Sequence, residues 1–329
     1  MPTVNILNEN DLRQCIALDT DAVSCMENCF RTLATEPVIM PPIMRLDIPQ
    51  RNAEIDVKTA YLPGVDSFAI KISPGFFENP KIGLPSVSGM MNLFSAHTGL
   101  LEAVLLDNGY LTNVRTAAAG AVAAKWLSRG DSRSVGIIGA GVQAGLQLEA
   151  VTLVRNIQQA RIWARDLDKA QKFCESMSAK LDLEIDVAES PADACVSADI
   201  VLTTTPSTTP LIEFSNLSPG QHVTAMGSDA EHKNEINPDI VSGANYLCDR
   251  LTQVKNMGEL HHAIEAGAVR EDHPFSEIGE VIAGRITGRK SAEDITVCDL
   301  TGTGAQDTAI AALARERSEA SEMGITISN

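Results

Sequence analysis

The chain has 329 residues, of which 44% are hydrophobic and 21% are charged, and 26 Lys and Arg stand against 43 Asp and Glu for a formal net charge of −17. This composition is that of a folded globular protein, and the length suggests about two domains. The negative charge argues against nucleic-acid and anionic-membrane partners, which attract basic proteins. No apolar run approaches the ~20 residues of a membrane span, and the first residues lack the pattern of a signal peptide, so a cytoplasmic protein is expected.

The seven cysteines are scattered and include no Cys-x-x-Cys pair. We therefore expect buried free thiols rather than a disulfide framework or a thiolate metal site. His261 and His262 stand in a predicted helix without the His-Glu-x-x-His pattern, and no metal site is predicted anywhere in the chain.

The first third of the chain predicts one helix followed by a sheet. After a cap at Asp19 or Thr20, the residues Val23, Met26 and Phe30 follow helical spacing. Short apolar stretches bounded by Pro and Gly then predict strands of an antiparallel or mixed sheet at residues 39–43, 55–61, 67–72 and 100–106. The Ala-rich stretch from Thr116 to Leu127 predicts a helix that joins this region to the next.

From Ser134 onward, strand-like and helix-length segments alternate. The predicted strands are residues 134–139, 160–165, 184–188, 199–205, 222–227, 245–249 and 295–300. This alternation is typical of a parallel sheet with crossover helices. A last helix, at about residues 305–322, is expected to return to the first region.

A glycine-rich turn stands between the first of these strands and the helix after it. Residues 139–144 read Gly-Ala-Gly-Val-Gln-Ala, which matches Gly-x-Gly-x-x-Ala. Gly139 permits a tight turn, Gly141 lets the backbone approach a pyrophosphate, and Ala144 lets the helix pack close to the sheet. The pattern predicts a dinucleotide site, with a purely structural turn as the alternative.

The residue that reads the ribose lies at the end of the next strand. The position where NAD-binding proteins place an acidic residue is Ala164, and Arg165 beside it is compatible with a 2′-phosphate. Asp166 could serve if the strand ends later. These residues leave NAD and NADP both open, and the cofactor expected for the whole chain is NAD, with NADP possible.

These patterns together predict an α/β protein of two domains. One is a Rossmann domain with a doubly wound parallel sheet at residues 116–304. The other is a discontinuous α+β domain at residues 1–115 and 305–329.

Three further segments resemble those of the ornithine cyclodeaminase and mu-crystallin family of amino-acid and imino-acid dehydrogenases. They are Val-Arg-Thr-Ala-Ala-Ala at 114–119, Ala-Met-Gly-Ser-Asp at 225–229 and Gly-Thr-Gly-Ala-Gln-Asp-Thr at 302–308. Their order and spacing cover nearly the whole chain. The resemblance implies a homodimer formed through the sheet of the first domain.

The resemblance also implies roles for individual residues. Arg45, Lys71 and Arg115 would face the substrate, where three cations suit an α-carboxylate, and Lys71 would also belong to the catalytic set. Asp229 would exchange a proton with the substrate nitrogen. The structural alternatives are that the arginines pair with acids at a domain boundary and that Asp229 caps a turn. The cofactor contacts implied by the glycine turn and the resemblance are Thr116, Gly139, Ala140, Gly141, Val142, Gln143, Arg165, Thr203, Thr205, Met226, Gly227 and Lys233.

One departure from the family pattern concerns the substrate. Relatives usually have Met-Pro-Ala before the substrate-facing Lys, whereas this chain has Lys58-Thr59-Ala60. Lys58 would read a second carboxylate, and the alternative is a solvated lysine on an edge strand.

The expected activity is NAD(P)H-dependent reduction of a small α-imino acid. The preferred reaction is iminosuccinate to aspartate, because the chain resembles the ectoine-utilisation cyclodeaminase-like branch, which lies close to iminosuccinate reductases. The alternatives are a cyclodeaminase, which releases ammonia from a diamino acid, and a non-catalytic crystallin-like binder. The partner is expected to be a small anionic imino or amino acid.

Overall fold

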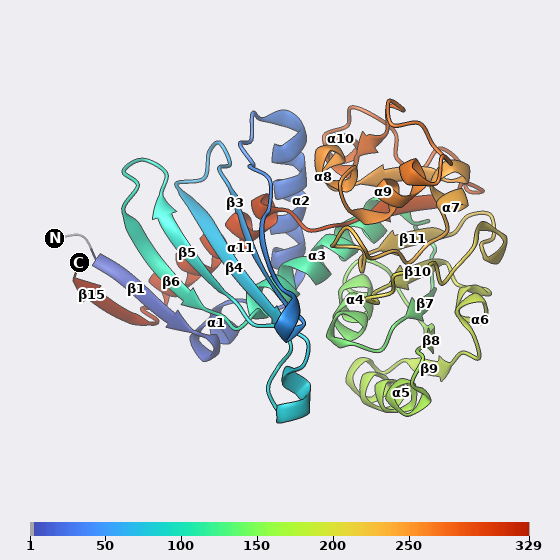
Figure 1. Ribbon diagram of the computed structural model, residues 1–329, viewed down its shortest axis with the longest axis horizontal. Coiled ribbons are helices and arrows are strands. Elements are labelled where there is room, and N and C mark those ends of the chain that lie inside the picture. Colours follow the sequence, from blue (N-terminus) through green and yellow to red (C-terminus); the bar gives the residue numbers. More distant parts are fainter. Residues whose placement is uncertain (1–2, 329) are drawn as a thin grey trace. The chain divides into compact units, whose positions relative to one another are not determined.

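The computed structural model describes residues 3–328, which form two compact units (Figure 1). The first unit takes in the chain up to Arg115 and again from Thr303 onward, and the second comprises Thr116–Gly302. The chain thus leaves the first unit once and returns to it by its last helix. None of the helices within residues 3–328 is long and apolar enough to cross a membrane.

The first unit is built on a seven-stranded sheet. Its strands are β1 (Thr3–Asn8), β2 (Met44–Ile48), β3 (Ala53–Ala60), β4 (Ser67–Phe76), β5 (Met90–Ser95), β6 (Leu101–Leu106) and β15 (Ile325–Ser328). They lie in the order β15-β1-β6-β5-β4-β3-β2, with β1 and β6 parallel and all other neighbours antiparallel. The central strands β3 and β4 are thus paired on both sides.

Three helices belong wholly to this unit, namely α1 (Glu9–Cys15), α2 (Thr20–Thr35) and α11 (Gly304–Ala320). The connecting loops add the 3₁₀ turns η1 (Pro49–Arg51) and η2 (Asn79–Ile82), and α3 (Tyr110–Leu127) begins in this unit and continues into the second. Helix α11 packs against α2, β3 and β4, behind the strands in Figure 1. Gly304 is required at its start because a Cβ there would lie 2.4 Å from the carbonyl oxygen of Thr59. The Thr308 hydroxyl, one turn on, donates to the Ala60 carbonyl at 2.9 Å and accepts from the Ala69 amide at 3.1 Å.

The second unit is built on an eight-stranded sheet in which every neighbouring pair is parallel. Its strands are β7 (Ser134–Ile138), β8 (Gln159–Trp163), β9 (Glu184–Val187), β10 (Ile200–Thr203), β11 (His222–Ala225), β12 (Asn245–Cys248), β13 (Ser276–Glu277) and β14 (Thr296–Asp299). They lie in the order β13-β12-β14-β11-β10-β7-β8-β9. The order reverses between β7 and β10, which makes the ends of these two strands a topological switch point.

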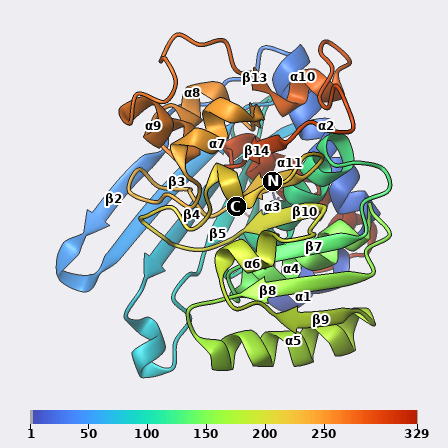
Figure 2. The ribbon, with the colours of Figure 1, turned by 90° about the vertical axis from the view of Figure 1, so that its right-hand side faces the viewer.

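The helices of the second unit connect these strands. They are α4 (Val142–Thr152), α5 (Leu167–Leu181), α6 (Pro191–Cys195), α7 (Pro238–Gly243), α8 (Leu251–Val254), α9 (Gly258–Glu265) and α10 (Ile278–Ile282), with the 3₁₀ turn η3 (Phe214–Asn216). Figure 2 shows α5 packed along the β9 end of the sheet. All residues of β7, β10, β11 and β14 are buried, because helices and loops cover both faces of a parallel sheet.

The predicted α/β class and parallel sheet are confirmed, but several predicted elements differ. The strand expected at residues 39–43 is wrong: Ile39 makes only an isolated bridge with Tyr61, and the strand begins at Met44. Pro41 and Pro42 lie between, and proline has no N–H to donate to a ladder. The helix expected from Thr116 begins at Tyr110, and β1, β5, β13 and β15 were not anticipated.

The cysteines lie mostly in the protein interior. All seven are free, and six of them are buried, with Cys25 half-buried. Their burial raises the thiol pKa values, as at Cys195, where the pKa reaches about 12. These thiols therefore act as small apolar core groups.

Gly136 in β7 offers a test of this packing. A Cβ at Gly136 would lie 2.1 Å from the carbonyl oxygen of Ala194 in α6, and backbone cannot yield as a flexible side chain can. We expect Gly136→Ala to lower the stability of the protein by about 2–3 kcal/mol, as overpacking does. The measurement is urea unfolding followed by circular dichroism.

Gly130→Ala is the matched control, because a Cβ at Gly130 meets nothing within 4 Å. Equal urea midpoints for the two variants would contradict the packing described for β7 and α6.

Candidate functional site

Four charged side chains are buried close together inside the first unit, where an unpaired charge would be strongly destabilising. Lys71 on β4 places its Nζ 3.0 Å from Oδ2 of Asp307, and Arg115 on α3 donates from Nε to Oδ1 of the same carboxylate at 2.9 Å. Lys58 stands directly opposite Lys71 in the register of β3 and β4, so both side chains share one face of the sheet. The exposed fractions are 7% for Lys58, 2% for Lys71, 5% for Arg115 and 0% for Asp307. We call these four residues the cation cluster.

The cation cluster carries more positive than negative charge. Burial lowers the pKa of Lys71 to about 8, with Asp307 opposing the fall and Arg115 and Lys58 adding to it. Burial alone would raise the pKa of Asp307, but Arg115, Lys71 and Lys58 together hold it below its ordinary value. One carboxylate therefore faces three cationic side chains. A second anion in this place would be stabilised by the cations that Asp307 only partly neutralises.

Burial changes the interpretation of Lys58. The alternative of a solvated lysine on an edge strand is wrong, because β3 lies between β2 and β4 and the side chain is almost fully buried. Burying a lysine beside a second lysine costs free energy unless a negative charge compensates it. Lys58 is therefore part of the same electrostatic unit as Lys71.

Arg45 has different partners. It lies on β2, where its guanidinium pairs with Asp47 at 2.9 Å, with Glu54 and, at 3.9 Å, with Asp56. The structure thus joins Arg45 to the acids of its own hairpin, and it joins Lys71 and Arg115 to Asp307. Its predicted role toward substrate stays a prediction.

In the second unit, the glycine turn follows β7 as predicted. Gly139 has φ +117°, and a Cβ there would lie 2.7 Å from Oγ1 of Thr204, so only glycine fits. Gly141 is the N-cap of α4, makes no side-chain cap hydrogen bond, and has open space where a Cβ would stand. Val142 is 68% exposed, whereas Ala144 is buried against the sheet. The turn leaves the amide groups at the start of α4 accessible to an anion, which suits a pyrophosphate.

The residues at the end of β8 are those that the sequence predicts to contact the ribose of a dinucleotide. Strand β8 ends at Trp163, so Ala164 and the exposed Arg165 follow it directly. Asp166 is the N-cap of α5, and its carboxylate accepts from the Lys169 amide at 3.1 Å. Thr116 is partly exposed, and its carbonyl accepts from Nε2 of Gln147 at 3.0 Å.

The loop that carries Asp229 follows β11 at the carboxyl edge of the sheet. Its side chain is 51% exposed, and Oδ1 lies 2.6 Å from Nζ of Lys233, whose side chain is 15% exposed. Met226 is buried, and Gly227 is partly exposed. An exposed carboxylate held by a neighbouring ammonium can accept or return a proton at a bound ligand.

Thr203 and Thr205 lie at and just beyond the end of β10. Thr203 is fully buried, and its hydroxyl donates to Oε2 of Glu235 at 2.7 Å. Thr205 is partly exposed, and its amide donates to Oε1 of the same carboxylate at 2.5 Å. The predicted adenosine contact of Thr203 therefore has no exposed side-chain atom to make it, although it stays a prediction for Thr205.

Sequence reasoning missed two residues that organise these sites. Asp307 stood inside the quoted Gly-Thr-Gly-Ala-Gln-Asp-Thr segment but was not assigned a role, and only the tertiary structure brings it to Lys71 and Arg115. Glu235, six residues after Asp229, had no motif at all. What distinguishes Glu235 is its burial among backbone amides, and a pattern of residue types does not reveal that burial.

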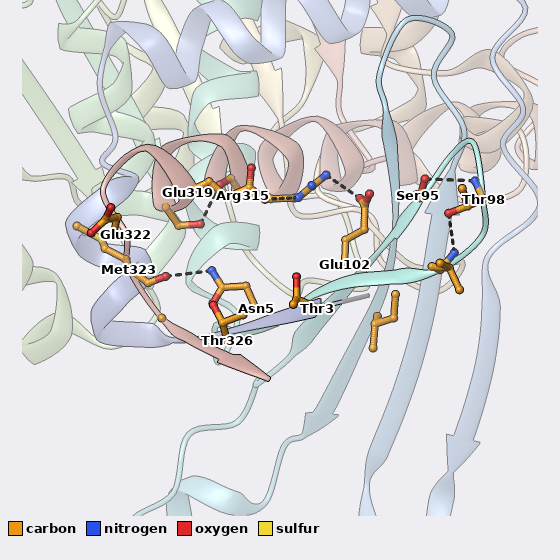
Figure 3. A pocket seen from close by; sticks show the side chains of 14 residues that line it. Thr3, Asn5, Ser95, Thr98, Glu102, Arg315, Glu319, Glu322, Met323 and Thr326 are labelled. Carbon is orange, nitrogen blue, oxygen red and sulfur yellow. Dashed lines mark hydrogen bonds and ion pairs between the residues drawn. The ribbon is translucent and has the colours of Figure 1, made fainter. Parts of the chain in front are cut away.

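A polar cavity of about 560 Å³ also lies in the first unit, between α11 and the strands β1, β6 and β15 (Figure 3). Its central cation, Arg315, already pairs with Glu102 at 2.6 Å and with Glu319 at 2.9 Å. None of the residues of the cation cluster lines it. We therefore do not assign the cavity to the reaction.

Comparison with known proteins extends over the whole chain. The model of the ornithine cyclodeaminase/mu-crystallin family matches residues 4–322. An uncharacterised cyclodeaminase of Sinorhizobium fredii is 59% identical over 326 residues, 98% of each protein. The alanine dehydrogenase of Archaeoglobus fulgidus is 35% identical over 326 residues, 98% of this chain and 97% of that protein.

Solved structures are similar over the same extent. An archaeal alanine dehydrogenase dimer with bound NAD superposes with a TM-score of 0.92 at 32% identity and 99% coverage of both chains. The Δ1-pyrroline-2-carboxylate reductase of Thermococcus litoralis, in complex with NADH and L-proline, gives 0.93 at 31% identity, covering 98% of this chain and 100% of that one. The iminosuccinate reductase of Paracoccus denitrificans, in complex with NAD⁺, gives 0.92 at 28% identity, covering 99% and 100%.

The pairing inside the cation cluster predicts the behaviour of Asp307→Asn. Three buried cations would lose their counter-charge, so we expect a loss of about 3–5 kcal/mol in the free energy of unfolding at pH 7. Lys71 has a pKa of about 8 in the folded protein against an ordinary 10.5, so the folded state holds fewer protons between these values and stability rises with pH there. Without Asp307 that pKa falls further, and the rise begins below pH 8. Urea unfolding at pH 7, 8 and 9 measures it.

The control is Asp131→Asn, which removes a 77% exposed carboxylate from a surface pair with Arg129. It should change stability by less than about 1 kcal/mol at each pH. Equal losses for the two variants would contradict the account of the cation cluster.

Proposed function

Because the chain belongs to the ornithine cyclodeaminase/mu-crystallin family, we propose that it is an NAD(H)-dependent reductase of a small α-imino acid. The observation that carries the proposal is the cation cluster, in which Lys58, Lys71 and Arg115 all act on the carboxylate of Asp307. In a protein of net charge −17, an anionic substrate is repelled at long range. A buried excess of cations offsets that repulsion locally.

The residues of the first unit would hold the substrate by its carboxylate. Arg115 offers a planar fork, and Lys71 a compact charge that stays protonated below about pH 8. Asp307 keeps both side chains in place, because it accepts from Arg115 and pairs with Lys71. Fixing the carboxylate orients the imine carbon for attack and removes rotational freedom from the reacting complex.

Asp229 in the second unit would act on the nitrogen. Its carboxylate would stabilise the positive charge of an iminium, and it would take or return a proton as the nitrogen becomes an amine. Lys233 would hold Asp229 ionised and oriented through the 2.6 Å contact.

The turn from Gly139 to Gln143 fits a dinucleotide, since α4 begins at Gly141, which has no side-chain cap and open space where a Cβ would stand. Thr116, Arg165, Thr205, Met226 and Gly227 would complete the contacts. When bound, the nicotinamide supplies or accepts the hydride. Reduction consumes one imine, one NADH and one proton, and it yields one amine and one NAD⁺.

Iminosuccinate is the substrate that we propose within this class, with aspartate as the product. Lys58 adds a third cation to Lys71 and Arg115, and its burial next to Lys71 suits a second carboxylate on a short substrate. The similarity to the iminosuccinate reductase of Paracoccus denitrificans supports the same choice. The alternative is a cyclodeaminase, which the name of the Sinorhizobium fredii relative favours.

The proposed assembly is a homodimer formed through the first unit. Exposed apolar side chains on and beside β2, the free edge of its sheet, support this: Ile39 is 65%, Met44 63% and Leu46 54% exposed. The other edge strand, β15, exposes Ile325 and Ile327. Monomeric proteins rarely leave such side chains together on an unpaired edge.

The test of the activity is NADH and NADPH oxidation with the imines formed from glyoxylate, pyruvate or oxaloacetate and ammonium. We expect stoichiometric NADH oxidation with oxaloacetate and ammonium, and aspartate as the product by chiral chromatography. Asp229→Ala should lower kcat by about 10²- to 10⁴-fold, the range for lost general acid–base catalysis. A cyclic imino acid formed from ornithine without net NADH consumption would establish the cyclodeaminase instead, and binding of NADH without any turnover would establish the crystallin-like binder.

Lys58→Met tests the substrate. Losing a hydrogen bond to a charged group should raise KM for the oxaloacetate-derived imine by about 10- to 100-fold and change KM for the pyruvate-derived imine much less. Lys172→Met, at an exposed position of α5, is the control and should leave both values unchanged. A parallel rise in both KM values would refute a role in reading a second carboxylate.

A further inference from the structure

Glu235 closes the loop that carries Asp229. Its carboxylate is fully buried, and Oε2 accepts from the Gly227 amide at 2.7 Å. Residues 227 and 235 are the two ends of the segment that contains Asp229 and Lys233. This hydrogen bond joins the start of the loop to its end.

The same carboxylate holds the neighbouring strand end. Oε2 also accepts from the Thr203 hydroxyl at 2.7 Å, and Oε1 accepts from the Thr205 amide at 2.5 Å. These donors come from the end of β10, whereas Gly227 follows β11. A Cβ at Gly227 would lie 2.2 Å from the Thr205 carbonyl oxygen and 2.5 Å from Oε2 of Glu235. The two strand ends are therefore pressed together with the carboxylate between them.

Two further buried carboxylates are linked to the backbone of Glu235: Glu259 directly and Asp299 through Glu259. The Glu235 amide donates to Oε1 of Glu259 at 2.9 Å, and the Glu259 amide donates to Oδ2 of Asp299 at 2.8 Å. Asn234 donates to the other oxygen of Glu259 at 2.6 Å. The three acids are thus joined in series through backbone amides, from the end of β14 to the loop after β11.

Burying the charge of Glu235 costs free energy, and its hydrogen bonds offset part of that cost. Burial raises the pKa of Glu235 to about 7, while the hydrogen bonds from Thr203, Thr205 and Gly227 favour its ionised form. A neutral amide has one accepting oxygen, and its NH₂ group would face at least one of these donors. Only a carboxylate satisfies all three from one side chain.

We propose that Glu235 is a positioning residue that sets the Asp229 loop and the Thr203–Thr205 strand end for dinucleotide binding and proton transfer. This inference rests on the proposed function, in which Asp229 exchanges the proton and Thr205 and Gly227 contact the dinucleotide. Glu235 and Thr203 are both fully buried, so they act through the backbone they hold rather than by touching the ligand.

The experiment compares Glu235→Gln with Glu231→Gln in the full-length protein. Glu231 lies in the same loop but is exposed, so the control makes the same chemical change at a site outside the carboxylate series. NADH affinity is measured by fluorescence titration, kcat and KM by NADH oxidation, and folding by thermal unfolding. For Glu235→Gln we expect an NADH Kd about tenfold higher and a lower kcat, with KM for the imino acid at saturating NADH within about twofold of the unmodified protein. Glu231→Gln should match the unmodified protein throughout.

A loss of folding alone would lower the unfolding temperature and, through the smaller amount of folded enzyme, the apparent kcat, but it would leave the NADH Kd of the folded protein unchanged. A second pair covers the case in which Glu235→Gln does not fold: Thr203→Val removes the hydroxyl donor, and Thr203→Ser restores it. We expect the NADH Kd to rise for the valine variant and to return toward the original value for the serine variant.

An NADH Kd for Glu235→Gln within twofold of the unmodified protein would overturn the proposal, as would equal Kd values for the two Thr203 variants. The NADH titration does not depend on which imino acid is reduced. If no imino acid were turned over, the proposed function would fail while the role of Glu235 in NADH binding would still be decided.

Discussion

The ion pairs of Asp307 with Lys71 and Arg115 are the interaction on which the first unit depends. Three elements far apart in sequence, the strand β4 and the helices α3 and α11, each contribute one charged side chain to this buried cluster. None of these groups would be tolerated there alone, because an unpaired buried charge is worth several kcal/mol against folding. When the chain returns from the second unit, α11 brings Asp307 to Lys71 and Arg115. The negative charge of Asp307 compensates the burial of these cations.

That arrangement also supports the proposed function, in which an acidic protein would bind an anionic substrate. The cations are kept by a single carboxylate that does not neutralise them fully, and Lys58 adds one more beside Lys71. Arg45, in contrast, is shared among the acids of its own hairpin. Arg45 therefore faces three acids of its own hairpin, whereas Lys58, Lys71 and Arg115 lie together around Asp307.

The second unit buries charge of the opposite sign. Glu235, Glu259 and Asp299 lie among backbone amides and hydroxyls, and burial raises the pKa of all three. Strand ends in a parallel sheet leave amides without ladder partners, and a carboxylate can accept several of them at once. The second unit thus buries acids that hold the loops at the carboxyl edge of its sheet, whereas the first unit buries an acid that pairs with cations.

The sequence by itself determined the alternation of strands and helices, the glycine turn at 139–141 and the family, because periodicity and the steric need for glycine are local properties. It failed at residues 39–43, where two prolines interrupt an apolar run, and at the short strands β1 and β15, which pair only with partners elsewhere. The tertiary structure alone decided that Lys58 is buried, that Arg45 pairs with its hairpin, that Asp307 meets Lys71 and Arg115, and that Glu235 accepts hydrogen bonds from the ends of two strands. Burial and ion pairing depend on which distant segments meet, and residue type and spacing along the chain do not contain that information.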